Sequence, residues 1–125
     1  MEKKQLRVLH IDDNREAREL LSLILGYEED LEEVGSHHDA EGLVELVRKT
    51  APDVLLIDLT MDGKDPIEAI QELREAFPDL RIVVFSGSSD PEMLERARAA
   101  GASQIERKGI DVPSTLKAIR GRGRV

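Results

Sequence analysis

The sequence predicts an α/β fold in which one doubly wound sheet of five parallel strands has helices on both faces. Three observations support this prediction. Short runs rich in Val, Ile, Leu and Phe, without regular polar alternation, at 8–11, 54–57 and 82–85, are typical of strands buried on both faces. Apolar residues recur with a helical period between these runs, and each run ends at a polar residue. Alternating strands and helices favour a parallel sheet with right-handed crossovers.

The first two helices are predicted from apolar stripes. In the first stripe Ala17, Leu20, Leu21, Ile24 and Leu25 recur at helical spacing, and Asn14 stands at the N-cap position. A weaker strand follows at about 31–36. The second stripe consists of Ala40, Leu43, Val44 and Val47, and we expect Asp39 to cap that helix.

The second half of the chain carries sharper helix signals. Asp65-Pro66 and Asp90-Pro91 each place a capping aspartate before a proline at the first helical position. Gly101 predicts the end of the second of these helices. A short strand at 104–107 and a last helix at about 113–120 complete five strands and five helices.

Length and composition restrict the possible functions. A chain of 125 residues holds one domain, which we assign to residues 1–120, with 121–125 as a basic tail or the start of a linker. With 18 basic and 26 acidic residues the net charge is −8, which argues against direct binding to nucleic acid or an anionic membrane. The chain has no cysteine, no apolar run of membrane-spanning length and no signal-peptide pattern, so we expect a cytoplasmic location.

Polar side chains stand at the predicted carboxyl ends of four strands. Asp12 and Asp13 follow the first strand, Asp58 the third, Ser86 the fourth and Lys108 the fifth. In an open parallel sheet ligands bind beyond these ends, so we expect the five side chains to meet at one edge.

Three carboxylates brought together would repel one another. Two unit charges at ~4 Å cost about 4 kcal/mol at an effective dielectric near 20. A retained proton or a hard cation relieves this repulsion, and an all-oxygen ligand set favours Mg²⁺ over zinc. With Lys108 as a fixed positive charge and Ser86 as a hydroxyl donor, the set is typical of a phosphoryl site with Asp58 as the acceptor.

Four motifs in order give this chain a family resemblance: IDDN at 11–14, LLIDLTM at 55–61, VVFSGS at 83–88 and the AGA…K segment at 100–108. Together they resemble the receiver domains of two-component response regulators, the CheY-like superfamily, over nearly the whole chain. The resemblance implies a flavodoxin-like sheet of strand order 2-1-3-4-5.

The same resemblance implies a site and its partners. Asp58 would accept a phosphoryl group from a phosphohistidine on a sensor histidine kinase or a phosphotransfer protein. Asp13, Asp58 and the backbone carbonyl of Thr60 would hold Mg²⁺, with Asp12 helping through water. Lys108 would contact the phosphoryl oxygens and Ser86 would swing toward them. Phosphorylation and dephosphorylation would be self-catalysed, so the chain would be a signalling domain.

The chain also departs from the family pattern, and Asp62 adds negative charge close to the site. Asp62 replaces the usual proline and Pro66 the usual glycine, which changes the loop after Asp58. Gly109 replaces the proline that usually follows the lysine in a cis bond. Ile105 stands where a switching Tyr or Phe is usual, so we expect a muted conformational response.

Other polar residues have simpler interpretations. Taken singly, Asp12-Asp13 could cap a turn, Lys108 could be a surface lysine and Ser86 could begin a turn. We expect His10 to be a buried, hydrogen-bonded neutral histidine. For His37 and His38 a loop or capping role is favoured over metal binding, and the acidic segment 28–33 is interpreted as a solvated face.

Two alternative functions remain open. One is a receiver-like dimerisation or docking module that phosphorylation does not regulate, which Asp62, Ile105 and Gly109 motivate. The other is a phosphohydrolase with an aspartyl-phosphate intermediate, although Thr60 stands where such enzymes usually carry a second aspartate. The segment 86–102 also looks similar to receivers that precede helix-turn-helix DNA-binding domains, and a homodimer is possible.

Overall fold

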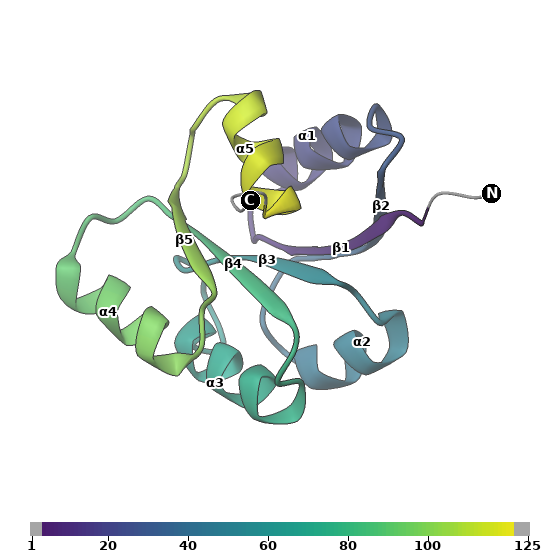
Figure 1. Cartoon of the computed structure of the whole chain (residues 1–125). Coiled ribbons are helices and arrows are strands. Elements are labelled where there is room, and N and C mark those ends of the chain that lie inside the picture. The colour runs from purple at the N-terminus through teal and green to yellow at the C-terminus, as the bar shows by residue number, and fades with distance from the viewer. Residues whose placement is uncertain (1–3, 122–125) are drawn as a thin grey trace.

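The computed structural model describes residues 4–121 as a five-stranded parallel sheet with helices on both faces (Figure 1). The strands are β1 (Leu6–Ile11), β2 (Leu31–His37), β3 (Val54–Asp58), β4 (Arg81–Ser86) and β5 (Gln104–Arg107). The helices are α1 (Arg15–Gly26), α2 (Leu43–Thr50), α3 (Pro66–Ala76), α4 (Pro91–Ala100) and α5 (Val112–Arg120). The strand order is 2-1-3-4-5, which confirms the prediction.

The sheet separates two hydrophobic cores. Figure 1 shows α1 and α5 on one face and α2, α3 and α4 on the other. Alternate residues of each strand point to opposite faces, so Val8 and Leu56 pack under α1 and α5, whereas Leu9 and Leu55 pack under the other three helices. β3 is buried at all five residues, which agrees with its uninterrupted apolar run.

Capping side chains begin most of the helices where the sequence predicts. Asn14 accepts a hydrogen bond from the backbone N–H of Ala17, and Asp65 and Asp90 accept theirs from Ile67 and Glu92. Gly101 caps the end of α4. Each cap satisfies an amide or carbonyl that the helix itself leaves unpaired.

The predicted start of α2 is wrong. We expected Asp39 as the N-cap and Ala40 as part of the helical stripe, but the helix begins at Leu43 after Gly42. Gly42 has φ of +68°, a left-handed conformation that interrupts a right-handed helix at that point. The Asp39 carboxylate instead accepts a hydrogen bond from the Glu41 amide in a local turn, and Ala40 is buried in the core.

The acidic segment after α1 is more than a solvated face. Arg120 at the end of α5 donates to both carboxylate oxygens of Asp30, at 2.8 Å each, and to Glu28 at 2.7 Å. The partner of this segment is therefore an arginine of the same chain. Gly121, the first residue of the predicted tail, caps α5, and residues 122–125 lie outside the described residues.

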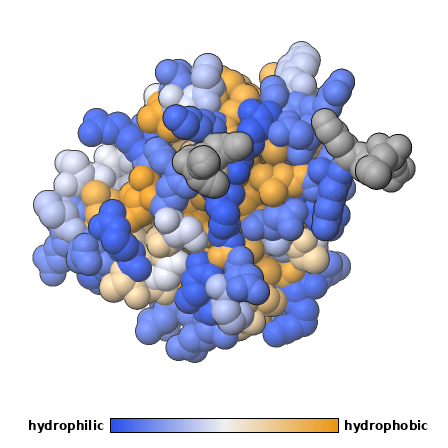
Figure 2. All heavy atoms as spheres, in the orientation of Figure 1, coloured by the Kyte–Doolittle hydropathy of each residue, from blue (hydrophilic) through white to orange (hydrophobic). Residues whose placement is uncertain are grey.

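Charged and polar side chains cover most of the face seen in Figure 2, with hydrophobic side chains visible in patches between them. Within residues 4–121 no helix has the length and hydrophobicity that a membrane span requires.

Candidate phosphoryl and metal site

Three carboxylates meet at the carboxyl edge of the sheet. Asp12 and Asp13 directly follow β1, and Asp58 is the last residue of β3, so the pairing of β1 with β3 brings them together. One ligand oxygen from each lies within 4.8 Å of the others. Asp12 and Asp58 are both 3% exposed, whereas Asp13 is exposed. The predicted cluster therefore forms, with one member open to solvent.

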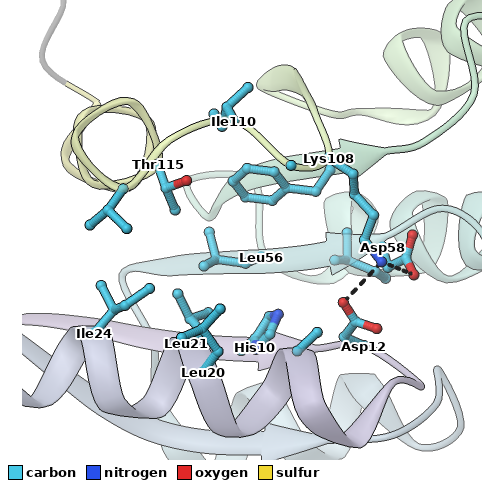
Figure 3. Close-up of a pocket in the computed structure, with 15 residues that line it drawn as sticks. His10, Asp12, Leu20, Leu21, Ile24, Leu56, Asp58, Lys108, Ile110 and Thr115 are labelled. Carbon is cyan, nitrogen blue, oxygen red and sulfur yellow. Dashed lines mark hydrogen bonds and ion pairs between the residues drawn. The ribbon is translucent and has the colours of Figure 1, made fainter.

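Lys108 supplies positive charge to this cluster (Figure 3). Its Nζ lies 3.0 Å from Oδ2 of Asp58 and 3.2 Å from Oδ2 of Asp12. Its backbone amide donates to the carbonyl of Ser86, which fixes the β5–α5 loop against the end of β4. One ammonium stands beside three carboxyl groups, so oxygen ligands outnumber the positive charges and a cation is favoured there.

Backbone amides orient the two buried carboxylates. Asp58 accepts a hydrogen bond from the amide of Thr60 at 3.0 Å, and Asp12 accepts one from the amide of Asn14 at 2.9 Å. Both bonds reach two residues ahead, as in the local turns that aspartate favours. Each carboxylate uses one oxygen for this bond and the other for Lys108, so neither side chain is free to rotate.

Burial and pairing act on the protonation of the site in opposite directions. Burial raises the pKa of Asp58 above its ordinary value, because the bonds from Thr60 and Lys108 only partly offset the loss of solvation. Burial also lowers the pKa of Lys108, but its hydrogen bond to Asp58 and the charges of Asp58 and Asp12 outweigh that effect and raise it overall. Lys108 therefore keeps its proton and its positive charge in this pair.

Ser86 lies at the same edge but is engaged in a turn. Its hydroxyl donates to the carbonyl of Ser88 at 3.2 Å and accepts from the amide of Ser88 at 3.0 Å. The side chain is 2% exposed. The turn role expected for Ser86 is confirmed, and its role toward a phosphoryl group stays a prediction.

The residues that depart from the family pattern have different environments. Asp62 is exposed on the loop after β3, and Ile105 packs into the core under α4. Gly109 has φ of +84°, a left-handed conformation that proline cannot adopt, since its ring holds φ near −65°. The loop that carries Lys108 is therefore built on a glycine conformation.

The histidines stand partly as predicted. Burial lowers the pKa of His10 to about 4, so it is neutral at physiological pH as expected. The expected hydrogen bond is wrong for one nitrogen: Nδ1 is buried and has no partner in the described part of the chain. His37, the last residue of β2, and His38 directly after it both approach the Asp39 carboxylate, at 3.5 and 3.4 Å.

The donor set fits Mg²⁺. The three carboxylates offer only oxygen atoms, which this ion prefers, and the exposed Asp13 leaves room for the waters that Mg²⁺ usually retains. Within the described residues this is the one group of three or more acidic, histidine or cysteine side chains close enough to share a metal ion.

Sequence reasoning missed two neighbours of the cluster. Arg18 on α1 donates to the backbone carbonyl of Asp12 at 2.7 Å and ties α1 to the site. His10 lines the same cavity as Asp12, Asp58 and Lys108. For His10 a signal was available: it stands two residues before Asp12, and such residues lie on the same side of a strand.

Sheet order and acidic edge together define a flavodoxin-like receiver fold. Residues 8–120 match the sequence profile of the response regulator receiver domain. The chain therefore belongs to this family, the receiver domains of two-component systems.

Among curated relatives, the chain is 32% identical over 116 residues to the transcriptional regulatory protein DegU of Brevibacillus brevis, covering 93% of this chain and 49% of that protein. It is 33% identical over 115 residues to LiaR of Bacillus subtilis strain 168, covering 92% and 54%. The chain thus spans about half the length of the curated relatives it matches.

Solved structures of response regulators have a similar fold. A LuxR-family response regulator from Aurantimonas sp. SI85-9A1 has a TM-score of 0.86 at 28% identity, covering 94% of this chain and 84% of that one. The receiver domain of a putative response regulator NarL from Mycobacterium tuberculosis has a TM-score of 0.84 at 26% identity, covering 96% and 100%.

Proposed function

We propose that this domain accepts a phosphoryl group on Asp58 in a Mg²⁺-dependent reaction and relays the change to an effector. The single observation that carries this proposal is the cluster of Asp12, Asp13 and Asp58 with Lys108 at 3.0 Å from the acceptor carboxylate. The donor is a phosphohistidine of a sensor histidine kinase or phosphotransfer protein. The P–N bond breaks as a P–O bond to the Asp58 carboxylate forms. The electron pair of the broken bond stays on the imidazole nitrogen, which takes up a proton from water.

Each residue of the site has a separate task. Asp12, Asp13, Asp58 and the backbone carbonyl of Thr60 hold Mg²⁺, which supplies positive charge to the transferring phosphoryl oxygens. Lys108 already contacts Asp58 and places its ammonium beside the incoming group. Positioning and electrostatics of this kind are sufficient for phosphoryl transfer.

Ser86 links phosphorylation to a conformational change. To reach a phosphoryl group on Asp58, its hydroxyl has to leave the two hydrogen bonds with Ser88. The phosphoryl group therefore favours a second arrangement of the β4–α4 loop, and a bias of ~1 to 3 kcal/mol is ordinary for such coupling.

The partners follow from the family and from charge. We propose that the chain is the receiver part of a cytoplasmic transcriptional regulator, since curated relatives about twice its length are named as transcriptional regulatory proteins. With a net charge of −8 the domain itself does not bind nucleic acid. Exposed apolar side chains at the end of α1 support a homodimer: Leu23 on the helix and Tyr27 directly after it.

Incubation with acetyl phosphate tests the proposal. We expect intact mass spectrometry to show one added phosphoryl group that requires Mg²⁺ and is absent from Asp58→Asn. The matched control is Asp62→Asn, which removes an exposed carboxylate from the same loop and leaves labelling intact. Wild-type protein that stays unlabelled with Mg²⁺ would support the docking module instead. Turnover of phosphomonoesters would support the phosphohydrolase.

A further inference from the structure

A cavity lies between α1 and α5, beside the acidic cluster. Its volume is about 200 Å³. Figure 3 shows Leu20, Leu21 and Ile24 of α1 on one side, Ile110 and Thr115 on the other, and Leu56 of β3 at the back. The Phe85 ring also lines it. Most of the lining is therefore apolar, and the charged groups stand at one end.

His10 is the polar exception within the apolar part. In Figure 3 its ring points from β1 into the space between the two helices. The residue is 7% exposed, and its Nδ1 has no hydrogen-bond partner in residues 4–121. A buried polar atom without a partner costs about 1 to 3 kcal/mol, so a native structure that retains one calls for an explanation.

Water alone explains this arrangement poorly. A buried water needs two to four polar partners. The other polar side chains of the lining already have partners: Asp12 and Asp58 pair with Lys108, and the Thr115 hydroxyl donates to the carbonyl of Asp111. An apolar cavity of about 150 Å³ in another protein accepts benzene, so the space here is large enough for a single ring.

We propose that this cavity binds a single-ring phenol, with its hydroxyl hydrogen-bonded to His10 and its ring against Phe85, Leu21 and Leu56. A hydroxyl both donates and accepts, so it satisfies the imidazole in either tautomer. The ring accounts for the apolar lining and the one hydroxyl for the one unpaired nitrogen. Lys108, whose ammonium contacts Asp58, lines one end of the same cavity.

The test compares phenol with toluene, which has nearly the same shape and no hydroxyl. In NMR titrations of the full chain, without Mg²⁺ or phosphodonor, phenol is expected to give saturable shifts at Leu21, Leu56 and Ile110. We expect toluene to bind at least fivefold more weakly. In His10→Leu, an apolar replacement of similar size, this preference disappears, while Thr115→Val retains it.

A second variant tests the location without touching His10. Ala17 lines the cavity from α1, and Ala17→Leu is expected to block both ligands by filling the space. Three results would overturn the proposal: shifts that do not saturate, equal affinities for phenol and toluene in wild type, or concentration-dependent self-association that excludes the ligand. Because the titration involves no phosphorylation, failure of the proposed function leaves its outcome unaffected.

Discussion

At the scale of the residue, Lys108 joins two carboxylates that are almost completely buried. It approaches Asp58 and Asp12 at 3.0 and 3.2 Å and is itself 36% exposed. The same ammonium that would assist a phosphoryl group therefore also competes with a metal ion for the carboxylates. Its two effects can be separated by removing the charge and keeping the aliphatic chain.

Lys108→Met is expected to bind Mg²⁺ about three- to tenfold more tightly than wild type, because a competing positive charge near the carboxylates is lost. The same variant should label more slowly with acetyl phosphate. Calorimetry and mass spectrometry measure the two quantities. Equal Mg²⁺ affinity in both proteins would contradict the placement of the ammonium in the cluster.

His10 predicts a pH effect on stability. Its pKa is about 4 in the folded protein, whereas an unperturbed histidine has a pKa of 6.5, so the unfolded chain binds more protons between these values. The contribution of neutral His10 to the free energy of unfolding is fully present above pH 6.5 and declines as pH falls toward 4. By about pH 5 the loss from this one group is about 2 kcal/mol.

The check is urea unfolding of wild type and His10→Leu at pH 7.5 and pH 5. Other groups titrate equally in both proteins, so the wild type should lose about 2 kcal/mol more than the variant. Parallel losses in the two proteins would show that the imidazole is solvated.

At the scale of the element, the β5–α5 loop and the end of α5 depend on tertiary contacts. Gly109 holds φ at +84° directly after Lys108. Arg120 connects the last turn of α5 to Asp30 and Glu28 before β2. These two features fix the loop and the helix that enclose the site and the cavity.

Gly109→Ala is expected to destabilise the fold by about 1 to 2 kcal/mol, since an L-residue resists the left-handed conformation. Gly26→Ala is the matched control, because no atom lies within 4 Å of the added methyl and the φ of Gly26 is not in the left-handed region. Alanine has a higher helix propensity than glycine, so this variant should be more stable than wild type. Thermal unfolding compares the two. Losses of equal size would contradict the conformation of Gly109.

Arg120→Ala is expected to lower the free energy of unfolding by about 1 kcal/mol. The value is modest because the ion pairs of Arg120 are partly solvated. Arg98→Ala removes an ion pair with Glu95 in which both side chains are more than half exposed, and it should change the stability little. Both are measured by urea unfolding in low and high salt. A salt-independent loss in Arg120→Ala would point to packing instead of charge.

At the scale of the whole molecule, the sequence was informative where structure depends on local pattern. Buried strands produce apolar runs, and Asp-Pro pairs begin helices, so the sheet and the residues at its edge were predictable. The start of α2 was missed because the helical stripe continues back through Ala40, and the pattern does not show that Gly42 interrupts the helix.

Contacts between distant side chains were not predictable. Arg120 and Asp30 are 90 residues apart, and nothing in the acidic segment indicates which arginine it meets. The cavity beside His10 depends on how α1 and α5 pack, which no periodicity encodes. The site residues were found because strand ends converge in any parallel sheet, whereas their exact pairing with Lys108 depends on the β5–α5 loop.

The central claim is that folding places Asp12, Asp13 and Asp58 in one cluster that takes a divalent cation. An NMR titration with Mg²⁺ that follows the three carboxyl carbons tests it most directly. We expect saturable shifts at all three in wild type and weaker binding in Asp13→Asn, with Asp62 little affected. Carboxyl signals of Asp12 and Asp58 that stay unchanged at saturating Mg²⁺ would contradict the account.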